Sequence, residues 1–230
     1  MSTTGNRKTA HELDDALRLL DHELNGLQLN EPVQIRAIGG YALLKHGVRR
    51  AEEAYTVDID TVTADYSAAV IAAIERVAEK AGLDPDWLNN YNLMGDPEDV
   101  EQMLDAEWLP QPMDLRNIAV SIASVPTLTR AKIIAADTAA LSGRQRDASD
   151  LEDLLEHQGI KSLSDFQRLY PDPYDEYPDA QALVRRHLGI AGAPKAKDRF
   201  PELNDVSLDG LDEDWADLDS VLVDHDFERW

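Results

Sequence analysis

Two aspartates one residue apart, Asp58 and Asp60, are the side chains in this sequence whose type and spacing best suit chemistry. They lie in the run 56–60, Thr-Val-Asp-Ile-Asp, which alternates as a strand does. Residues i and i+2 of a strand point to the same face, so the two carboxylates should project side by side. Mg²⁺ bound between them would offset their mutual repulsion and could share its oxygen ligands with substrate phosphates.

A glycine pair, Gly39-Gly40, stands between the alternating run Val33–Ile38 and an amphipathic segment that should be helical to about His46. Without a Cβ, both glycines let the backbone approach a ligand closely. The first N–H groups of a helix and its positive dipole end suit a phosphate. The sequence therefore predicts a phosphate cradle beside a metal-binding acid pair.

This order of strand, Gly-Gly helix start and Asp-x-Asp strand resembles the nucleotidyltransferase superfamily, which has the DNA polymerase beta-like fold. The closest resemblance is to its AbiEii-type branch, found in bacterial toxin–antitoxin and phage-defence systems, where the acid pair commonly reads Thr-x-Asp-Ile-Asp. A Gly-Leu followed by Trp-Leu-Asn (82–89), Lys132 on a later helix, and the run 146–151, Arg-Asp-Ala-Ser-Asp-Leu, also match this branch.

The resemblance implies a set of site residues. It implies that Mg²⁺ is held by Asp58 and Asp60, and that a nucleoside triphosphate (NTP) is the substrate. It implies the NTP-binding residues Gly39, Gly40 and Lys132, and the catalytic residues Asp58, Asp60, Lys132 and Asp150.

Lys132 has two interpretations. A lysine facing the acid pair could hold a triphosphate as a compact positive charge, and an aspartate one helix later could hold Lys132 in place or receive a proton. Alternatively, Lys132 forms a structural salt bridge with Asp147 or Asp150 between two helices.

Many members of the superfamily carry a third carboxylate on a later strand. By position Asp114 is the nearest candidate, with Asp105 and Glu107 as weaker ones, and an ordinary surface acid is the alternative for each. The basic residue that often shortly precedes the acid pair in the family is displaced here, because Arg49 and Arg50 lie further back.

The strands and helices expected around these residues indicate an α/β (α+β) fold. By resemblance, it has a small mixed nucleotidyltransferase-like sheet flanked by helices. Strands are expected over 33–38, 55–62 and 118–123, with an extended edge segment within 106–113. Helices are expected from a capping box at Thr9 and Glu12 to about Gly26, and from about 67 to 81. We expect residues 1–125 to form the core and 126–190 a C-terminal helical part.

Composition narrows the classes of function. The chain has 230 residues, no cysteine and a formal net charge of −23, so disulfides and thiolate chemistry are excluded. An acidic surface repels nucleic acid, so a DNA-binding module is not expected. The polar N-terminus has no signal-peptide core, and no run approaches the ~20 apolar residues of a membrane span. A cytoplasmic location without membrane association is expected.

The acidic tail, residues 191–230, contains large apolar residues such as Trp215 and Trp230, which purely disordered tails lack. We expect a helix over 211–222 that docks on the body of the protein or on a second copy in a homo-oligomer. A nucleic-acid mimic that covers the active cleft is a less favoured alternative.

The expected function is Mg²⁺-dependent transfer of a nucleotidyl group from an NTP to a hydroxyl acceptor on tRNA or a protein. By resemblance, the chain would be the toxin of a toxin–antitoxin or phage-defence pair, with a cognate antitoxin as partner. One alternative is a catalytically inactive relic of the fold that acts as an antitoxin or binding partner of a toxin. Another is a nucleotidyltransferase for small molecules.

Overall fold

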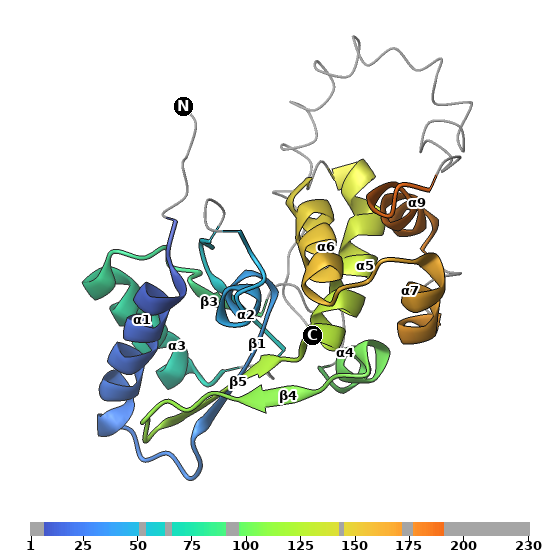
Figure 1. The fold of residues 1–230 in the computed structure, drawn as a ribbon. Coiled ribbons are helices and arrows are strands. Elements are labelled where there is room, and N and C mark those ends of the chain that lie inside the picture. Colours follow the sequence, from blue (N-terminus) through green and yellow to red (C-terminus); the bar gives the residue numbers. More distant parts are fainter. Residues whose placement is uncertain are drawn as a thin grey trace, which may run out of the picture. The chain divides into compact units, whose positions relative to one another are not determined.

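A mixed five-stranded sheet organises the fold in the order β3-β2-β1-β5-β4 (Figure 1). The computed structural model describes residues 7–50, 54–62, 66–90, 97–142, 145–171 and 177–190. The central pair, β1 and β5, is parallel, whereas β1–β2 and β4–β5 are antiparallel and β2–β3 is parallel. The strands are β1 (Val33–Ile38), β2 (Ile59–Thr61), β3 (Leu88–Asn89), β4 (Trp108–Pro110) and β5 (Ile118–Ala123).

Helices pack around this sheet and beyond it, which confirms the predicted α/β class. They are α1 (Ala10–Glu23), the 3-10 turn η1 (Leu24–Gly26), α2 (Gly39–Lys45), α3 (Ala68–Ala81), α4 (Pro97–Leu104), α5 (Val125–Ser142), α6 (Gln145–His157), α7 (Leu163–Leu169) and α9 (Pro178–His187). The capping box at Thr9 and Glu12 is present, and Ser67 caps α3. These side chains satisfy backbone N–H groups that the first helical turn leaves without a partner.

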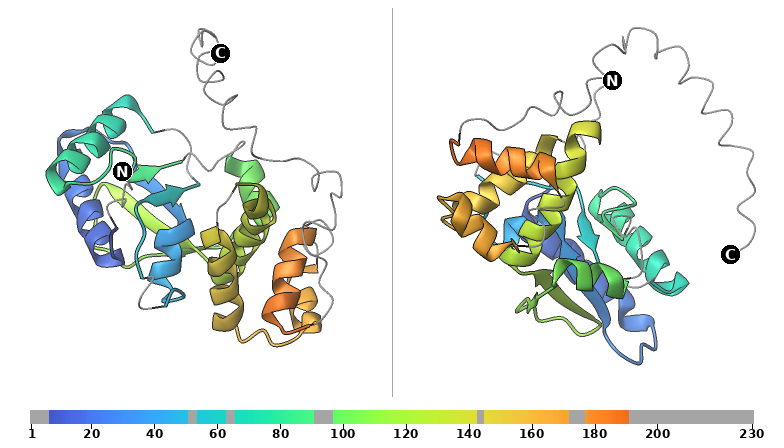
Figure 2. Two further views of the ribbon diagram at one scale, coloured as in Figure 1. Left: turned by 90° about the horizontal axis from the view of Figure 1, so that it is seen from above. Right: turned by 90° about the vertical axis from the view of Figure 1, so that its right-hand side faces the viewer.

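Two hydrophobic cores lie within residues 1–190, which form one compact unit. The first joins the sheet to α1, α2 and α3, and α1 and α3 lie side by side (Figure 2). The second joins α5 to α6, α7 and α9. Leu128 of α5 belongs to the first core and Ile133 of the same helix to the second, so α5 connects the sheet to the helical part.

The strand predicted over 55–62 is shorter in the structure, where β2 contains Asp60 but not Asp58. Of this range, only Ile59–Thr61 (β2) pairs with the neighbouring strands of the sheet. Thr56 forms a separate antiparallel bridge with Lys8. The structure also adds β3, which the sequence presented as part of a loop. Trp87 in that segment is fully buried and donates its indole N–H to the Ile74 carbonyl, so it anchors β3 against α3.

The expected tail helix over 211–222 lies outside the described residues. In the part of the chain that the structure describes, no helix combines the length and the apolar character needed to cross a bilayer.

Candidate active site

The glycine pair packs directly against Asp60 and Thr56. Register places Ile38 at the end of β1 opposite Asp60 of β2, so Gly39 begins α2 beside that aspartate. Gly39 has φ +69°, and a Cβ built on it would lie 2.6 Å from Asp60 Oδ2. A Cβ on Gly40 would lie 2.4 Å from Thr56 Oγ1. Only glycine fits both positions without a shift of the neighbouring atoms, so the two sequence features form one site.

Asn89 of β3 completes this side of the site. Its Cα is the register partner of Asp60, and its Nδ2 donates to Asp58 Oδ2 at 3.3 Å and to the Asp86 carbonyl at 3.0 Å. Asp58 itself lies immediately before β2. Sequence reasoning gave Asn89 no role, because a two-residue strand has too few residues to show a period.

The environment of Asp58 works against its ionisation. Burial raises the pKa of this carboxyl, while hydrogen bonds with Asn89 and Thr56 and the charges of Arg49 and Arg146 lower it. Burial prevails, and the pKa lies above its ordinary value. A cation bound at the acid pair would favour the ionised form of Asp58.

The residues present suit a magnesium ion that is shared with a substrate. Among the described residues there is no cluster of three or more acidic or histidine side chains that could hold a metal alone. Mg²⁺ commonly binds through one or two carboxylates together with water and substrate phosphates. Asp58 and Asp60 can supply those carboxylates, and the start of α2 lies next to Asp60.

The helical part contributes a buried ion-pair network. Arg49 donates through Nε to Asp150 Oδ1 (2.8 Å) and through Nη2 to Asp150 Oδ2 (2.9 Å), and both side chains are almost fully buried. Lys132 Nζ lies 2.5 Å from Asp147 Oδ1 and 2.8 Å from Asp150 Oδ2. The predicted Lys132–aspartate contacts are therefore present, and Asp150 is shared between two cations.

Asp150 is held in its ionised form. Burial alone would raise the pKa of Asp150, but the hydrogen bonds and charges of Arg49 and Lys132 outweigh it, so the pKa lies below its ordinary value. A carboxylate in this state is a poor proton acceptor, which favours a positioning role over a proton-accepting one.

Three guanidinium groups surround Tyr55, the residue before Thr56. Arg49 Nη1 and Arg146 Nη2 both donate to the Tyr55 carbonyl at 2.6 Å. Over the Tyr55 ring, the guanidinium carbon of Arg7 lies 4.1 Å from the centroid and that of Arg146 lies 4.5 Å from it. The Lys8–Thr56 bridge brings Arg7 here, with backbone hydrogen bonds of 2.6 and 2.9 Å.

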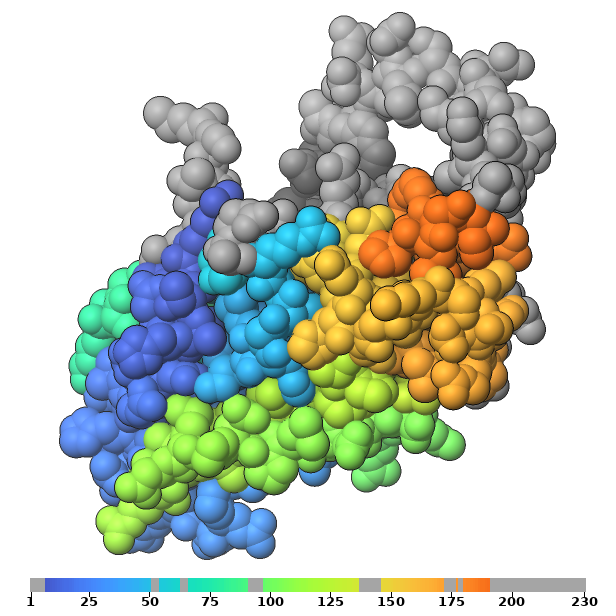
Figure 3. Space-filling model, in the orientation of Figure 1, coloured from blue at the N-terminus to red at the C-terminus, as the bar shows by residue number. Residues whose placement is uncertain are grey.

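The segment around α2 and helix α6, which are far apart in sequence, also meet at the surface. In the space-filling view, the light-blue segment that contains α2 and its flanks adjoins the yellow residues of α6 (Figure 3). Arg50 pairs with Asp153 across the same contact, at 3.0 Å.

The three candidates for a third carboxylate lie elsewhere. Asp105 and Glu107 precede β4 and Asp114 follows it, and β4 is separated from β2 by β1 and β5. All three are exposed, and Asp105 pairs with Arg130 at 3.2 Å. The structure brings none of them to the neighbouring strand of the acid pair, where Asn89 lies instead.

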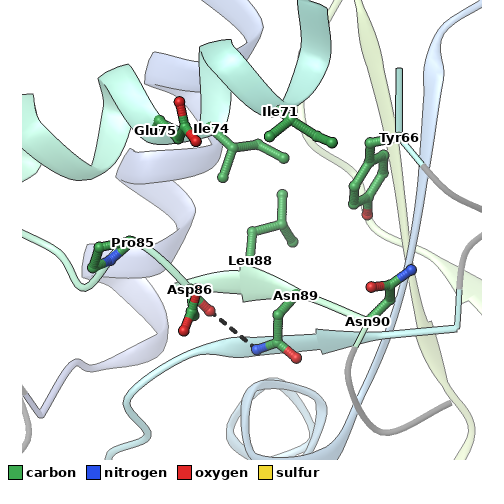
Figure 4. Close-up of a pocket in the computed structure, with 9 residues that line it drawn as sticks. All are labelled: Tyr66, Ile71, Ile74, Glu75, Pro85, Asp86, Leu88, Asn89 and Asn90. Atoms are coloured by element: carbon green, nitrogen blue, oxygen red, sulfur yellow. Dashed lines mark hydrogen bonds between the residues drawn. The ribbon is translucent and has the colours of Figure 1, made fainter. Parts of the chain in front are cut away.

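A pocket of about 400 Å³ opens at the β3 edge of the sheet (Figure 4). Ile71 and Ile74 of α3 face Leu88 across it, whereas the Asn89 side chain points away from α3 (Figure 4). Glu75 and Asp86 line the pocket as well, and their carboxylates would repel a phosphate. The pocket thus suits an uncharged or cationic group better than a phosphate chain.

Comparison of the chain with models of known protein families, with curated proteins and with solved structures found no match.

Proposed function

We propose that this protein is a Mg²⁺-dependent nucleotidyltransferase that moves a nucleotidyl group from an NTP to a hydroxyl acceptor. The observation that carries the proposal is the direct packing of Gly39 and Gly40 against Asp60 and Thr56. A glycine helix start next to Asp60, with Asp58 two residues before that aspartate, suits a phosphate and a shared magnesium ion.

In this proposal each residue has a separate task. Asp58 and Asp60 hold the ion, which when bound neutralises charge on the reacting phosphate. Gly39 and Gly40 bring the start of α2 against Asp60, where the phosphate chain would bind. Asn89 fixes the orientation of the Asp58 carboxylate, and Asp150 positions Arg49 and Lys132. The acceptor, a hydroxyl on tRNA or on a protein, would enter from a side that the phosphate chain leaves open.

A catalytically inactive binding protein of the same fold, acting as the antitoxin or partner half of a pair, is the second candidate. It is favoured by the position of Asn89, because among the described residues it, and not a third acid, lies on the strand beside the acid pair. An inactive protein could still bind NTP, so binding alone does not separate the two candidates.

A transfer assay separates them. The full-length protein is incubated with each NTP labelled at the α-phosphate, with Mg²⁺ or with a chelator, and with a total RNA and protein extract or a small-molecule pool as acceptor. We expect Mg²⁺-dependent label on one acceptor class with the wild type and none with Asp58→Asn. Binding of NTP in a thermal-shift titration without label transfer to any acceptor would favour the binding protein.

A further inference from the structure

We propose that Arg7 and Arg146, stacked on the ring of Tyr55, form an anion site that takes the phosphate chain of the NTP. The identity of the ligand rests on the proposed nucleotidyltransferase function, whereas the site itself is read from the contacts of these three residues. In this proposal Arg7 and Arg146 bind the triphosphate, which is the role that the sequence suggested for Lys132.

Charge pairing separates the cations of the site into two groups. Arg49 and Lys132 are buried against Asp150 and Asp147, so their charges are already neutralised. Arg7 and Arg146, in contrast, form no ion pair with a carboxylate among the described residues, and their contacts are the Tyr55 ring and, for Arg146, the Tyr55 carbonyl. Contact with an aromatic face or a carbonyl leaves the positive charge in place.

The guanidinium groups of Arg7 and Arg146 place two like charges at one aromatic ring. Arg49 and Arg146 converge on one carbonyl oxygen, and Arg7 and Arg146 lie over one ring. Arg49 is neutralised by Asp150, whereas Arg7 and Arg146 have no carboxylate partner among the described residues, and these two like charges repel each other. An anion with several oxygens would relieve this repulsion, because each guanidinium has five N–H donors and only some are used here.

The chemistry of arginine points to a phosphate chain. A planar guanidinium donates two parallel hydrogen bonds to phosphate oxygens, and stacking on Tyr55 fixes its plane before the ligand arrives. The site also lies next to the acid pair, since Tyr55 is three residues before Asp58 and the charge of Arg146 reaches that carboxyl. A triphosphate could therefore contact the arginines at one end and a magnesium ion on Asp58 and Asp60 at the other.

The test is calorimetric titration of the full-length protein with inorganic tripolyphosphate in the presence of a chelator, so that no metal contributes. We expect saturable binding by the wild type. Arg7→Gln and Arg146→Gln should each weaken it about tenfold, the loss of a charge-assisted hydrogen bond. Arg168→Gln is the matched control, because Arg168 lies exposed on α7 and pairs only with Asp165 among the described residues. It should bind as the wild type does.

A further variant separates a built site from diffuse positive charge. Tyr55→Leu keeps every charge and the backbone carbonyl but removes the ring, and we expect several-fold weaker binding. Equal affinity of this variant and the wild type would overturn the stacked-arginine geometry. Arg7 is exposed, so Arg7→Gln should fold and remains informative even if a change at Arg146 disturbs α6.

The outcomes also separate this site from the proposed function. Asp58→Asn should bind tripolyphosphate at least as tightly as the wild type, because it removes a nearby negative charge. Arginine-dependent binding without label transfer to any acceptor would leave the anion site standing and remove the transferase. If label transfer depends on Asp58 but both arginine variants bind tripolyphosphate as the wild type does, the transferase stands and the anion site is ruled out.

Discussion

At the scale of single residues, the buried pair Arg49–Asp150 should contribute strongly to stability. Removing the charge of Asp150 leaves a buried guanidinium without its carboxylate, and breaking a buried ion pair from one side costs about 3–5 kcal/mol. We expect Asp150→Asn to lower the free energy of unfolding by this amount in urea denaturation. Asp15→Asn breaks the exposed Arg18–Asp15 pair and should cost about 1 kcal/mol or less. Similar losses in the two variants would contradict the buried network.

Removing the charge of Asp58, unlike that of Asp150, should not destabilise the protein. Its pKa is raised in the folded protein, so the ionised carboxylate at neutral pH lowers stability, and this penalty disappears as the pH falls through the raised pKa. In metal-free buffer we expect Asp58→Asn to melt at the same temperature as the wild type or above it at neutral pH. The difference should shrink on acidification, because the wild-type carboxyl is then protonated. A variant that melts well below the wild type at neutral pH would show that the charge is needed for folding.

An experiment can decide whether Lys132 is a structural salt-bridge partner or a phosphate-binding residue. Its side chain is mostly buried against Asp147 and Asp150, so we expect Lys132→Met to lower the melting temperature and to change tripolyphosphate affinity little. Lys80→Met serves as the control, since Lys80 pairs with Glu23 at the surface of α3. Loss of tripolyphosphate affinity with an unchanged melting temperature would instead support the direct phosphate contact.

At the scale of elements, the start of α2 should tolerate no side chain. A methyl group on Gly40 would lie 2.4 Å from Thr56 Oγ1 and 3.1 Å from Arg49 Nη1, and overpacking of this kind costs about 1–3 kcal/mol. We expect Gly40→Ala to be destabilised by this amount in thermal or urea unfolding. Gly26→Ala, with open space around it, should be nearly neutral. Adding Thr56→Ala should recover part of the loss in a double-mutant cycle, and strictly additive effects would argue against the contact.

Much of the element pattern could be predicted from local signals. The helix of α1 follows from its capping box, α3 from its serine cap and apolar face, and β1 and β5 from alternating runs. The acid pair and the glycine pair could be placed together, because strand, helix and strand follow one another in the chain. In contrast, β3 has two residues and owes its place to the burial of Trp87, which periodicity does not report.

The remaining parts of the candidate site depend on contacts between distant segments. The Lys8–Thr56 bridge brings Arg7 to Tyr55, and nothing in the polar N-terminal sequence indicates this partner. Arg49 and Asp150 are 101 positions apart, so only the packing of α6 against the segment after α2 reveals their pairing. For Lys132 the sequence offered both interpretations, and only the structure gives the distances to Asp147 and Asp150 that favour the salt bridge.

At the scale of the whole molecule, the net charge of −23 should make stability depend on salt. Self-repulsion among like charges weakens the folded state, and it is screened as the Debye length falls. We expect the melting temperature to rise by a few degrees when NaCl is increased in chelator-containing buffer, since about 1 kcal/mol shifts it by about 2–4 °C at this size. Tetramethylammonium chloride at equal ionic strength should act alike if screening is the cause. A melting temperature that falls with both salts would contradict this prediction.

The distance in sequence between Arg49 and Asp150 also bears on how the protein is made. Chains leave the ribosome from the N-terminus, and early segments fold while later ones are still being synthesised. The glycine pair and the acid pair emerge first, with Arg49 lacking its carboxylate until α6 has followed. A nascent chain, or a fragment truncated before α6, therefore carries Asp58 and Asp60 without the network that holds Arg49 in place. Assembly of the candidate site is tied to translation of at least the first 150 residues.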